Sequence, residues 1–199
     1  KWIATGEDAD PAKRVQYSVD NGTTWAPLTL PTIEASTNVT SIVNVPNTNK
    51  SIKSTDNGAN WTIIDNNVFS ASTNKIHYSG AAGLWMAVGE GGSHTLATST
   101  DGINWTGKGM VFNIKGSSVY YKAGVWVAVG EDTNNMKNIA FSSNNGVSWS
   151  NPSVVLLYTN SNDVTYAYGR WFVCGDSSYV YWSDDGTTWN TTNKVNVTY

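Results

Sequence analysis

The positions most able to do chemistry recur at one place in a repeated pattern of the chain. Four of them are carboxylates that follow a short apolar run closed by glycine, namely Glu7, Glu90, Glu131 and Asp176. A fifth, Asn47, stands at the corresponding place in a run whose pattern has diverged. Carboxylates gathered at one rim can bind sugar hydroxyls or a cation, and a pair that flanks a glycosidic bond can hydrolyse it. These five residues are therefore candidate ligand-binding residues.

The run that carries these acids predicts a buried strand. It reads WIATGE from Trp2, WMAVGE from Trp85, WVAVGE from Trp126 and WFVCGD from Trp171. β-Branched and aromatic residues are frequent in it and glycine ends it, as in a strand covered on both faces. A tyrosine-rich run precedes three of the copies, at residues 76–78, 119–121 and 164–166. We name the tyrosine-rich strand A and the strand that ends in the acid B.

Another element ends each repeat with a tight turn and a tryptophan. The chain contains it five times, at residues 17–25, 53–61, 97–105, 141–149 and 181–189. Every copy has Gly three residues before the final Trp and Asn or Asp four before it, which is a strong signal for a β-hairpin. We name this element the box. The closing tryptophans recur every 36 to 44 residues, which indicates a repeat architecture; they are Trp25, Trp61, Trp105, Trp149 and Trp189.

The boxes resemble the Asp-box, or bacterial neuraminidase repeat, whose pattern is Ser-x-Asp-x-Gly-x-x-Trp. The first two copies match it at every position. Aligned on the final Trp, the other three depart: Thr100 and Asn144 stand where the family has Asp, and the serine of the fifth copy is displaced to Ser183. The resemblance implies a fold element at the outer hairpin of a propeller blade, not a catalytic site. The family includes sialidases, sortilin-like receptors, photosystem assembly factors and many binding proteins, so it implies a fold and hardly a function.

The repeats predict an all-β fold, a five-bladed β-propeller of four-stranded antiparallel blades in a single domain, residues 1–199. Strand C leads into the box and strand D follows it; helical periodicity is absent, and a β-solenoid is the structural rival. Residues 193–199 align with a strand A at 162–168, and the chain begins at a strand B. We therefore expect the C-terminal strand to pair with the N-terminal blade and close the ring. A piece cut from a longer array would show the same phase at both ends.

The order of strands also predicts where a ligand would bind. In such a blade the B–C and D–A loops lie at one end of the propeller and the boxes at the other, so the candidate acids should lie opposite the boxes. The alternative is that an acid repeated in every blade serves the blade, by accepting hydrogen bonds from a neighbouring loop. Trp182 alone among the ten tryptophans stands outside the repeat pattern. It is a sixth candidate for ligand binding, with blade packing as the alternative.

Some function classes need residues that the chain lacks. Sialidases, which resemble this repeat, hold the substrate carboxylate with three arginines, and the sequence has only Arg14 and Arg170. A net charge of −3 without a basic stripe argues against nucleic-acid binding. His77 and His94 have no spaced Cys or carboxylate partner, so we expect neither a metal nor a cofactor. Cys174, alone inside a strand, is expected to be a buried small residue.

The composition favours a β-protein that works at a surface. Charged residues make up only 14% of the chain, and no stretch approaches the roughly 18 apolar residues of a membrane span. We expect a non-catalytic recognition or structural module that binds glycan or protein on an extracellular or particle surface, without membrane insertion, as part of a larger chain or assembly. Two alternatives stay open. One is a glycoside hydrolase with paired carboxylates at the B–C loop face, and the other is a purely architectural subunit.

Overall fold

The computed structural model describes residues 2–5, 15–18, 20, 22–27, 41–45, 48–56, 60–65, 67–133, 138–152, 160–176 and 179–191. Within these residues the chain consists of strands, turns and loops and has no helix, so none that could cross a membrane. Every strand pair is antiparallel, which confirms the predicted all-β class.

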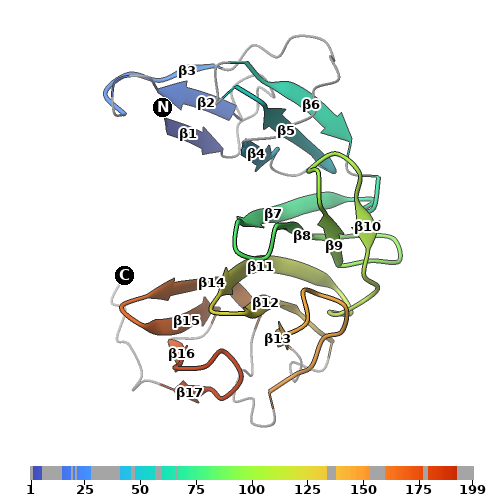
Figure 1. Ribbon diagram of the computed structural model, residues 1–199, viewed down its shortest axis with the longest axis vertical. Helices are drawn as coiled ribbons and strands as arrows, with labels where there is room; N and C mark the ends of the chain where they lie inside the picture. Colours follow the sequence, from blue (N-terminus) through green and yellow to red (C-terminus); the bar gives the residue numbers. More distant parts are fainter. Residues whose placement is uncertain are drawn as a thin grey trace.

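The strands fall into five units that follow the five sequence repeats (Figure 1). Units 1 and 2 contain β1 (Trp2–Thr5), β2 (Val15–Ser18) and β3 (Ala26–Pro27), then β4 (Ser41–Asn44), β5 (Lys50–Ser54) and β6 (Thr62–Asp65). Unit 3 contains β7 (Ser72–Ser79), β8 (Leu84–Glu90), β9 (Leu96–Ser99) and β10 (Thr106–Gly107). Unit 4 contains β11 (Lys115–Lys122), β12 (Val125–Glu131) and β13 (Ile139–Ser142). Unit 5 contains β14 (Ser161–Ala167), β15 (Arg170–Gly175), β16 (Tyr181–Ser183) and β17 (Asn190–Thr191).

The predicted A-B-C-D strand order is present in full in units 3 and 5. In unit 4 the outer strand is reduced to one bridge between Phe141 and Ser150. Beyond that bridge the Asn151 side chain donates a hydrogen bond to the carbonyl oxygen of Ile139 at 2.9 Å, and Pro152 is buried. Within the described residues, the Asn151 side chain therefore occupies the edge of β13 next to this bridge.

The units lie side by side around an arc, with units 1 and 5 at its two ends (Figure 1). The A strands β7, β11 and β14 are neighbours along the inner side of this arc. One residue pair, Lys115 with Glu90, joins the sheets of units 3 and 4. The sheets of units 1 and 5 share no strand pairing within the described residues. Residues 193–199 lie outside these residues, so the closed ring of five blades stays a prediction.

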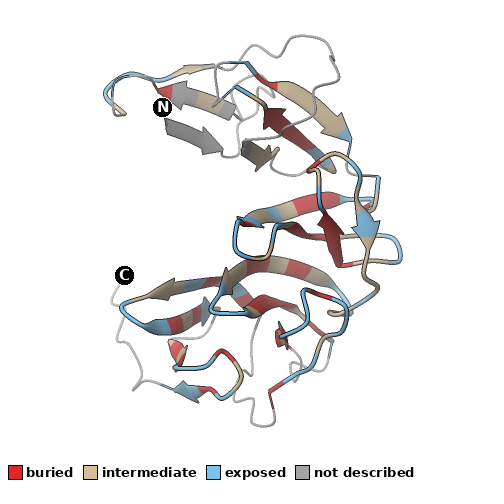
Figure 2. Cartoon of the chain, in the orientation of Figure 1, coloured by how far each residue is buried: buried red, intermediate tan, exposed pale blue. Residues whose placement is uncertain are grey.

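The core lies between neighbouring sheets. Val127 and Val129 of β12 pack with Val164, Trp171 and Trp189 of unit 5, all of them 8% exposed or less. A second cluster of this kind joins units 3 and 4. Burying each such side chain stabilises the fold by about 1.5–3 kcal/mol. Figure 2 shows the buried positions concentrated on the strands and the exposed ones at the turns, so the interfaces between units hold the arc together.

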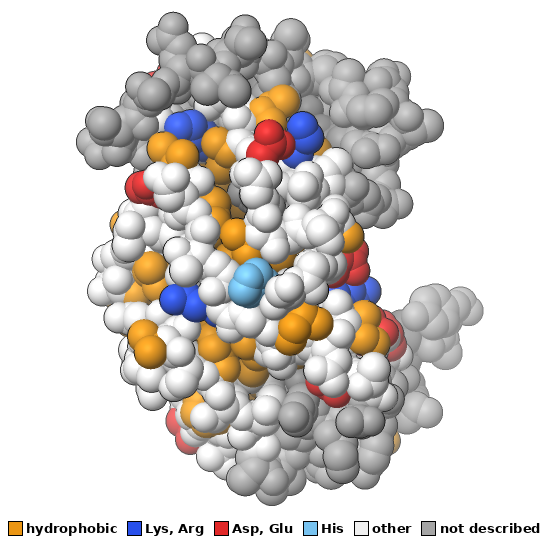
Figure 3. Space-filling view, turned by 90° about the vertical axis from the view of Figure 1, so that its right-hand side faces the viewer, with side chains coloured by type: hydrophobic (Ala, Val, Ile, Leu, Met, Phe, Trp, Pro, Cys, Tyr) orange, Lys and Arg blue, Asp and Glu red, His pale blue; other side chains and the backbone are white. Residues whose placement is uncertain are grey.

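The described part of the face in Figure 3 is mostly uncharged, as the low share of charged residues predicts. Figure 3 shows one side of the molecule, where apolar side chains form small groups and the Lys, Arg, Asp and Glu side chains are scattered among uncharged ones. The described part of that side has no basic stripe of the kind that follows a nucleic-acid backbone.

The glycine that ends strand B lies against the backbone of the neighbouring strand A. A Cβ atom on Gly89 or Gly130 would lie 2.3 or 2.2 Å from a backbone carbonyl oxygen of strand A, and one on Gly175 would lie 2.0 Å from that of Asn160, the residue before strand A. The rings of Phe69 and Phe112 pack against the first two glycines from the other side. No side chain fits into this space, which explains why glycine precedes the acid in these three units.

Cys174 is exposed, so the expectation of a buried cysteine is wrong. It lies three residues after the strand-B tryptophan, at the position that Val88 and Val129 occupy in units 3 and 4, where both are fully buried. The following unit covers those two valines. Burial at this position therefore depends on a following unit and not on the type of residue.

Candidate functional site

Each box is held by one repeated contact between side chains. A serine hydroxyl lies 2.8–3.0 Å from a side-chain oxygen of the Asp or Asn two residues later in all five copies. The pairs are Ser18–Asp20, Ser54–Asp56, Ser99–Asp101, Ser142–Asn144 and Ser183–Asp185. The contact is thus common to the boxes that match the family pattern and to those that depart from it.

The third and fifth boxes are one residue shorter between this Asp and the glycine. The strand pairing shows this difference in length. The strand-B tryptophan pairs with the box serine, Trp85 with Ser99 and Trp171 with Ser183, so the serines are the equivalent positions of the boxes. The alignment on the final Trp, which put Thr100 at the place of the Asp, is therefore wrong. The signal was present in the sequence as the constant spacing of the serine from the Asp or Asn that follows it.

The box carboxylate stabilises its own turn. Asp101 accepts hydrogen bonds from the backbone amides of Asn104 and Ile103, both at 2.8 Å, and from the Asn104 side chain at 2.7 Å. Burial alone would raise the pKa of Asp101, but these hydrogen bonds outweigh it and hold the pKa well below its ordinary value. The side chain and backbone amide of Thr24 likewise lower the pKa of Asp20 to about 2. The box carboxylate therefore accepts its hydrogen bonds from groups of its own turn.

The box tryptophan closes the same turn. Trp25 and Trp189 donate from Nε1 to the carbonyl oxygens of Gly22 and Gly186, at 3.0 and 3.2 Å. Both glycines have a positive φ, which most side chains would make unfavourable. The sequence analysis correctly interpreted the box as a fold element of the hairpin.

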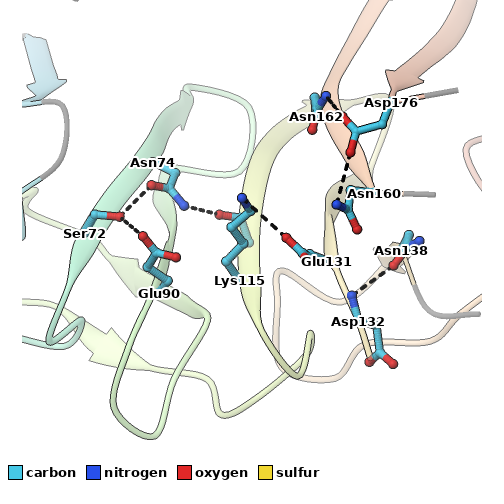
Figure 4. A network of polar contacts seen from close by, with 11 residues as sticks. Ser72, Asn74, Glu90, Lys115, Glu131, Asp132, Asn138, Asn160, Asn162 and Asp176 are labelled. Atoms are coloured by element: carbon cyan, nitrogen blue, oxygen red, sulfur yellow. Dashed lines mark hydrogen bonds and ion pairs between the residues drawn. The ribbon is translucent and has the colours of Figure 1, made fainter. Parts of the chain in front are cut away.

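The acids that end strand B are bonded to strand A of their own unit (Figure 4). Glu90 lies 2.8 Å from the hydroxyl of Ser72, the residue paired with it across the two strands. Glu131 forms an ion pair with Lys115, its own paired residue, with 3.4 Å between Oε2 and Nζ. Because Lys115 also pairs with the backbone of Glu90, the two acids lie on β8 and β12, the strands on either side of β11.

Asp176 is held in the same manner by two amides. It accepts hydrogen bonds from Nδ2 of Asn160 at 3.1 Å and from Nδ2 of Asn162 at 2.7 Å. All three described acids thus lie at the same end of strand B, as predicted, and each has a partner within its unit. These contacts agree with the alternative in which a repeated acid serves its blade.

A chain of polar contacts crosses from unit 3 to unit 4. Oγ of Ser72 lies 2.7 Å from Oδ1 of Asn74 as well as 2.8 Å from Glu90, so its single hydrogen is shared between two acceptors. Nδ2 of Asn74 then donates to the carbonyl oxygen of Gly116 in unit 4 at 2.8 Å. The surroundings of Glu90 therefore contribute to the junction between two units.

The remaining candidates lie elsewhere. Glu7 and Asn47 fall outside the described residues. Trp182 is half-buried in β16, away from the end of strand B, and the Arg170 guanidinium stacks on its ring at 4.3 Å from the ring centre. Nε of Arg170 donates to Asp184 at 2.8 Å. The structure therefore brings three acids to one end of their units and places Trp182 in a separate cluster.

Both histidines have packing partners. Nδ1 of His94 accepts a hydrogen bond from the Gly109 amide at 2.8 Å. His77 stacks on Tyr120 of the next unit at 4.4 Å between ring centres, and burial followed by the charge of Lys75 lowers its pKa. Among the described residues, no three His, Cys, Asp or Glu side chains are grouped so that they could hold a metal ion.

The sequence analysis missed an exposed corner in unit 5. Tyr168 and Gly169 form the tight turn between β14 and β15, with φ of +50° and +81°, and the Tyr168 side chain is fully exposed. Arg170, which follows, stands at the first pairing position of strand B, where unit 4 has Val125. A comparison of the turns between units would have found it, since unit 4 has Ala123 in place of the tyrosine.

The fold is that of a β-propeller. No protein-family model and no curated protein matches the sequence. Among solved structures, one that matches is described as YCF48 bound to D1 peptide, a β-propeller. It superposes with a TM-score of 0.55 at 19% identity, over 91% of this chain and 61% of that one. This chain therefore spans about three fifths of that neighbour's length, and the likeness concerns the fold alone.

Proposed function

We propose that the chain is a non-catalytic β-propeller module that binds a protein partner on an extracellular or particle surface. The observation that carries the proposal is the exposed corner of unit 5, formed by Tyr168 and Arg170 with Trp182 behind them. Tyr, Arg and Trp are the residues that most often dominate the energy of protein–protein contacts. The partner's surface would contact the Tyr168 ring and the half-exposed Arg170 side chain.

The equivalent turn and strand of unit 4 do not require these residues. Ala123 fills the place of Tyr168 in unit 4 with nearly the same positive φ, so the turn needs no ring. A non-glycine residue with positive φ costs about 1 kcal/mol, and an exposed ring recovers little of that by burial. Val125 likewise fills the place of Arg170 and is half-buried there. Repeats of one unit reveal what the fold requires, and residues beyond that requirement are candidates for function.

The acids at the end of strand B give weaker support for another role. Each of these acids has a partner in its own unit, so its contact can stabilise the unit without a ligand; the acids are Glu90, Glu131 and Asp176. Catalysis by paired carboxylates would need two of them to flank a bound sugar, so we propose that the module is not an enzyme. Binding of glycan by these acids, with Glu7 and Asn47, remains a prediction that the same experiment tests.

The neighbour's bound peptide fits this proposal. A β-propeller of similar architecture was solved with a peptide, so the architecture is compatible with holding a polypeptide segment. The Asp-box resemblance allows binding members and does not require catalysis. We also propose that the five units form a closed ring, in which residues 193–199 supply the inner strand of unit 1. Closure would pair an open edge of β1, and proteins generally avoid leaving such edges free.

The test uses variants that copy unit 4. A phage library of random peptides is panned on the whole chain, and a recovered synthetic peptide is titrated calorimetrically against the wild type, Tyr168→Ala and Arg170→Val. We expect each variant to lose about tenfold in affinity, equivalent to about 1.4 kcal/mol. Tyr168→Ala should keep the thermal midpoint of the wild type, because unit 4 has alanine at this turn. Arg170→Val should lower the midpoint only slightly, because it removes an exposed ion pair with Asp184.

The Glu90→Gln, Glu131→Gln double variant is the matched control and should bind the peptide normally. A glycan array and fluorogenic glycosides are assayed beside it. Glycan binding or glycoside hydrolysis that the Gln variant loses would replace the proposal with a lectin or a hydrolase at the acid end. Peptides that bind all variants equally would place the partner's contact elsewhere, and assembly without any peptide or glycan ligand would favour an architectural subunit.

A further inference from the structure

Three of the five boxes have an asparagine directly before their glycine, at Asn21, Asn57 and Asn145. An Asn-Gly step is chemically labile. The backbone nitrogen of the glycine attacks Cγ of the asparagine side chain, which forms a C–N bond in a five-membered imide and releases Nδ2 as ammonia, while a solvent base takes the proton of the attacking amide. Water then opens the imide to aspartate or isoaspartate. Glycine favours this attack because it has no side chain to hinder it.

Asn145 is the member of this set that lies within the described residues, and its side chain is exposed to water. The third and fifth boxes have Asp101 and Asp185 directly before their glycines. Burial would raise the pKa of both carboxyl groups, but hydrogen bonds from the amides of their turns hold it well below the ordinary value. A carboxylate is a poor target for the attack, because it has no neutral leaving group. Asn145 therefore combines exposure to water with an amide that can leave as ammonia.

The attacking nitrogen is held by the box serine. The Gly146 amide donates a hydrogen bond to Oγ of Ser142 at 2.9 Å. The equivalent amides of Gly22, Gly102 and Gly186 donate to their own box serines at 2.8 Å. Gly146 is also buried against unit 3, where a Cβ atom on it would lie 2.8 Å from Cε of Met86. The nitrogen must lose its proton to a solvent base and turn toward Cγ of Asn145, so both contacts have to break before the imide can form.

We propose that Asn145 is a latent modification site, whose conversion to aspartate and isoaspartate is controlled by Ser142. While the box is closed, the Asn145–Gly146 step is protected; when the turn opens locally, the reaction proceeds. Isoaspartate adds one carbon to the backbone of the turn, so the box could not close again with the same contacts. The serine thus has a chemical role beside its structural one, and this role is independent of the peptide-binding corner of unit 5.

The test compares two variants that each remove one hydroxyl from the fourth box. Wild type, Ser142→Ala and Ser148→Ala are kept in native buffer at mildly alkaline pH, and aspartate and isoaspartate are quantified by peptide mass spectrometry. We expect Ser142→Ala to convert Asn145 about tenfold faster than the wild type, because one buried hydrogen bond is lost. Ser148→Ala removes an exposed hydroxyl that binds Asn144 and leaves the Gly146 amide bonded, so its rate should equal that of the wild type. Equal acceleration by both variants would overturn the proposal.

The other two Asn-Gly steps separate local opening from unfolding of the whole chain. Ser142→Ala should accelerate the reaction at position 145 alone. Equal acceleration at positions 21, 57 and 145 would show that the serine stabilises the chain as a whole and would contradict its control of one step. A second measurement needs no variant: conversion of Asn145 in the wild type is followed in native buffer and in urea. Protection predicts a native rate slower by about tenfold or more, and equal rates would show that the closed box protects nothing.

Discussion

The two ends of a unit hold their polar groups in different ways. At the box end, the serine binds an Asp or Asn side chain two residues later in every unit, within a range of 2.8–3.0 Å. At the other end, the acid that closes strand B has a hydroxyl partner in unit 3, an ammonium in unit 4 and two amides in unit 5. The box serine and the strand-B acid both recur, but only the serine has the same kind of partner in every unit.

The difference follows from the distance along the chain between the partners. Box partners are neighbours in sequence, so each copy of the turn carries its whole set of contacts with it. The partner of the acid comes from another strand, where any residue with a suitable donor can serve. At the acid end the invariant element is the glycine before the acid, since backbone approach and not a side chain fixes the geometry.

The largest loss of stability should come from replacing the glycine before the acid. Gly130→Ala would place a Cβ 2.2 Å from the carbonyl oxygen of Lys115 and 2.7 Å from the Phe112 ring. Overpacking of this kind typically costs 1–3 kcal/mol, and we expect about 3 kcal/mol in the free energy of unfolding. Urea denaturation measures it. Gly124→Ala in the same pair of strands is the control, because its Cβ meets open space; with its positive φ alone, it should cost about 1 kcal/mol. Equal losses would mean that close approach is not the constraint.

A smaller effect should distinguish two adjacent carboxylates in the fifth box. Asp185 accepts hydrogen bonds from the amides of Thr187 and Thr188, both at 2.7 Å, whereas Asp184 binds only the exposed Arg170 among the described contacts. Asp185→Ala should lower the free energy of unfolding by about 1–2 kcal/mol, as the loss of a helix-capping side chain does. Asp184→Ala should cost less than about 1 kcal/mol, as for an exposed ion pair. If Asp184→Ala proved the more costly, the shorter alignment of this box would be wrong.

The smallest change near neutral pH should come from Asp101→Asn, since Asn144 fills the same place in unit 4. Its consequence appears in acid. The folded-state pKa of Asp101 lies below the ordinary value of 3.8, so its carboxylate stabilises the fold above about pH 4 and loses this contribution as the pH falls toward the folded-state pKa. Chemical unfolding of both proteins between about pH 6 and pH 2 should show less acid destabilisation in the variant. Parallel curves would indicate that other groups control acid unfolding.

The fold could be predicted because its signals are local. Asn-Gly and Asp-Gly turns, the closing tryptophans and the Trp-to-Gly strands each specify their own structure, and the order of strands followed from their succession. The chain-end pairing at 193–199 falls outside the described residues, so that prediction is untested.

The candidate site was less predictable because its geometry depends on register. Which residue meets Glu131 is decided by a bulge in strand A, between Gly116 and Ser118, that no pattern in the sequence announces. Alignment on the final tryptophan concealed the shortened boxes, since the deletion lies between Asp and Gly. The exposure of Cys174 escaped prediction because it depends on whether another unit covers it. Sequence alone thus gave the position of the acids but not their partners.

The outer edge of unit 4 affects how copies of the chain can associate. In the described part of this edge, the bridge between Phe141 and Ser150 and the Asn151 amide on the Ile139 carbonyl occupy backbone groups of β13 that could otherwise pair with a strand of another molecule. A second copy of the chain would therefore find fewer free backbone groups for sheet-to-sheet pairing along β13. Protection of this kind acts through the backbone, so it does not depend on electrostatic repulsion in a chain whose charged residues make up only 14%.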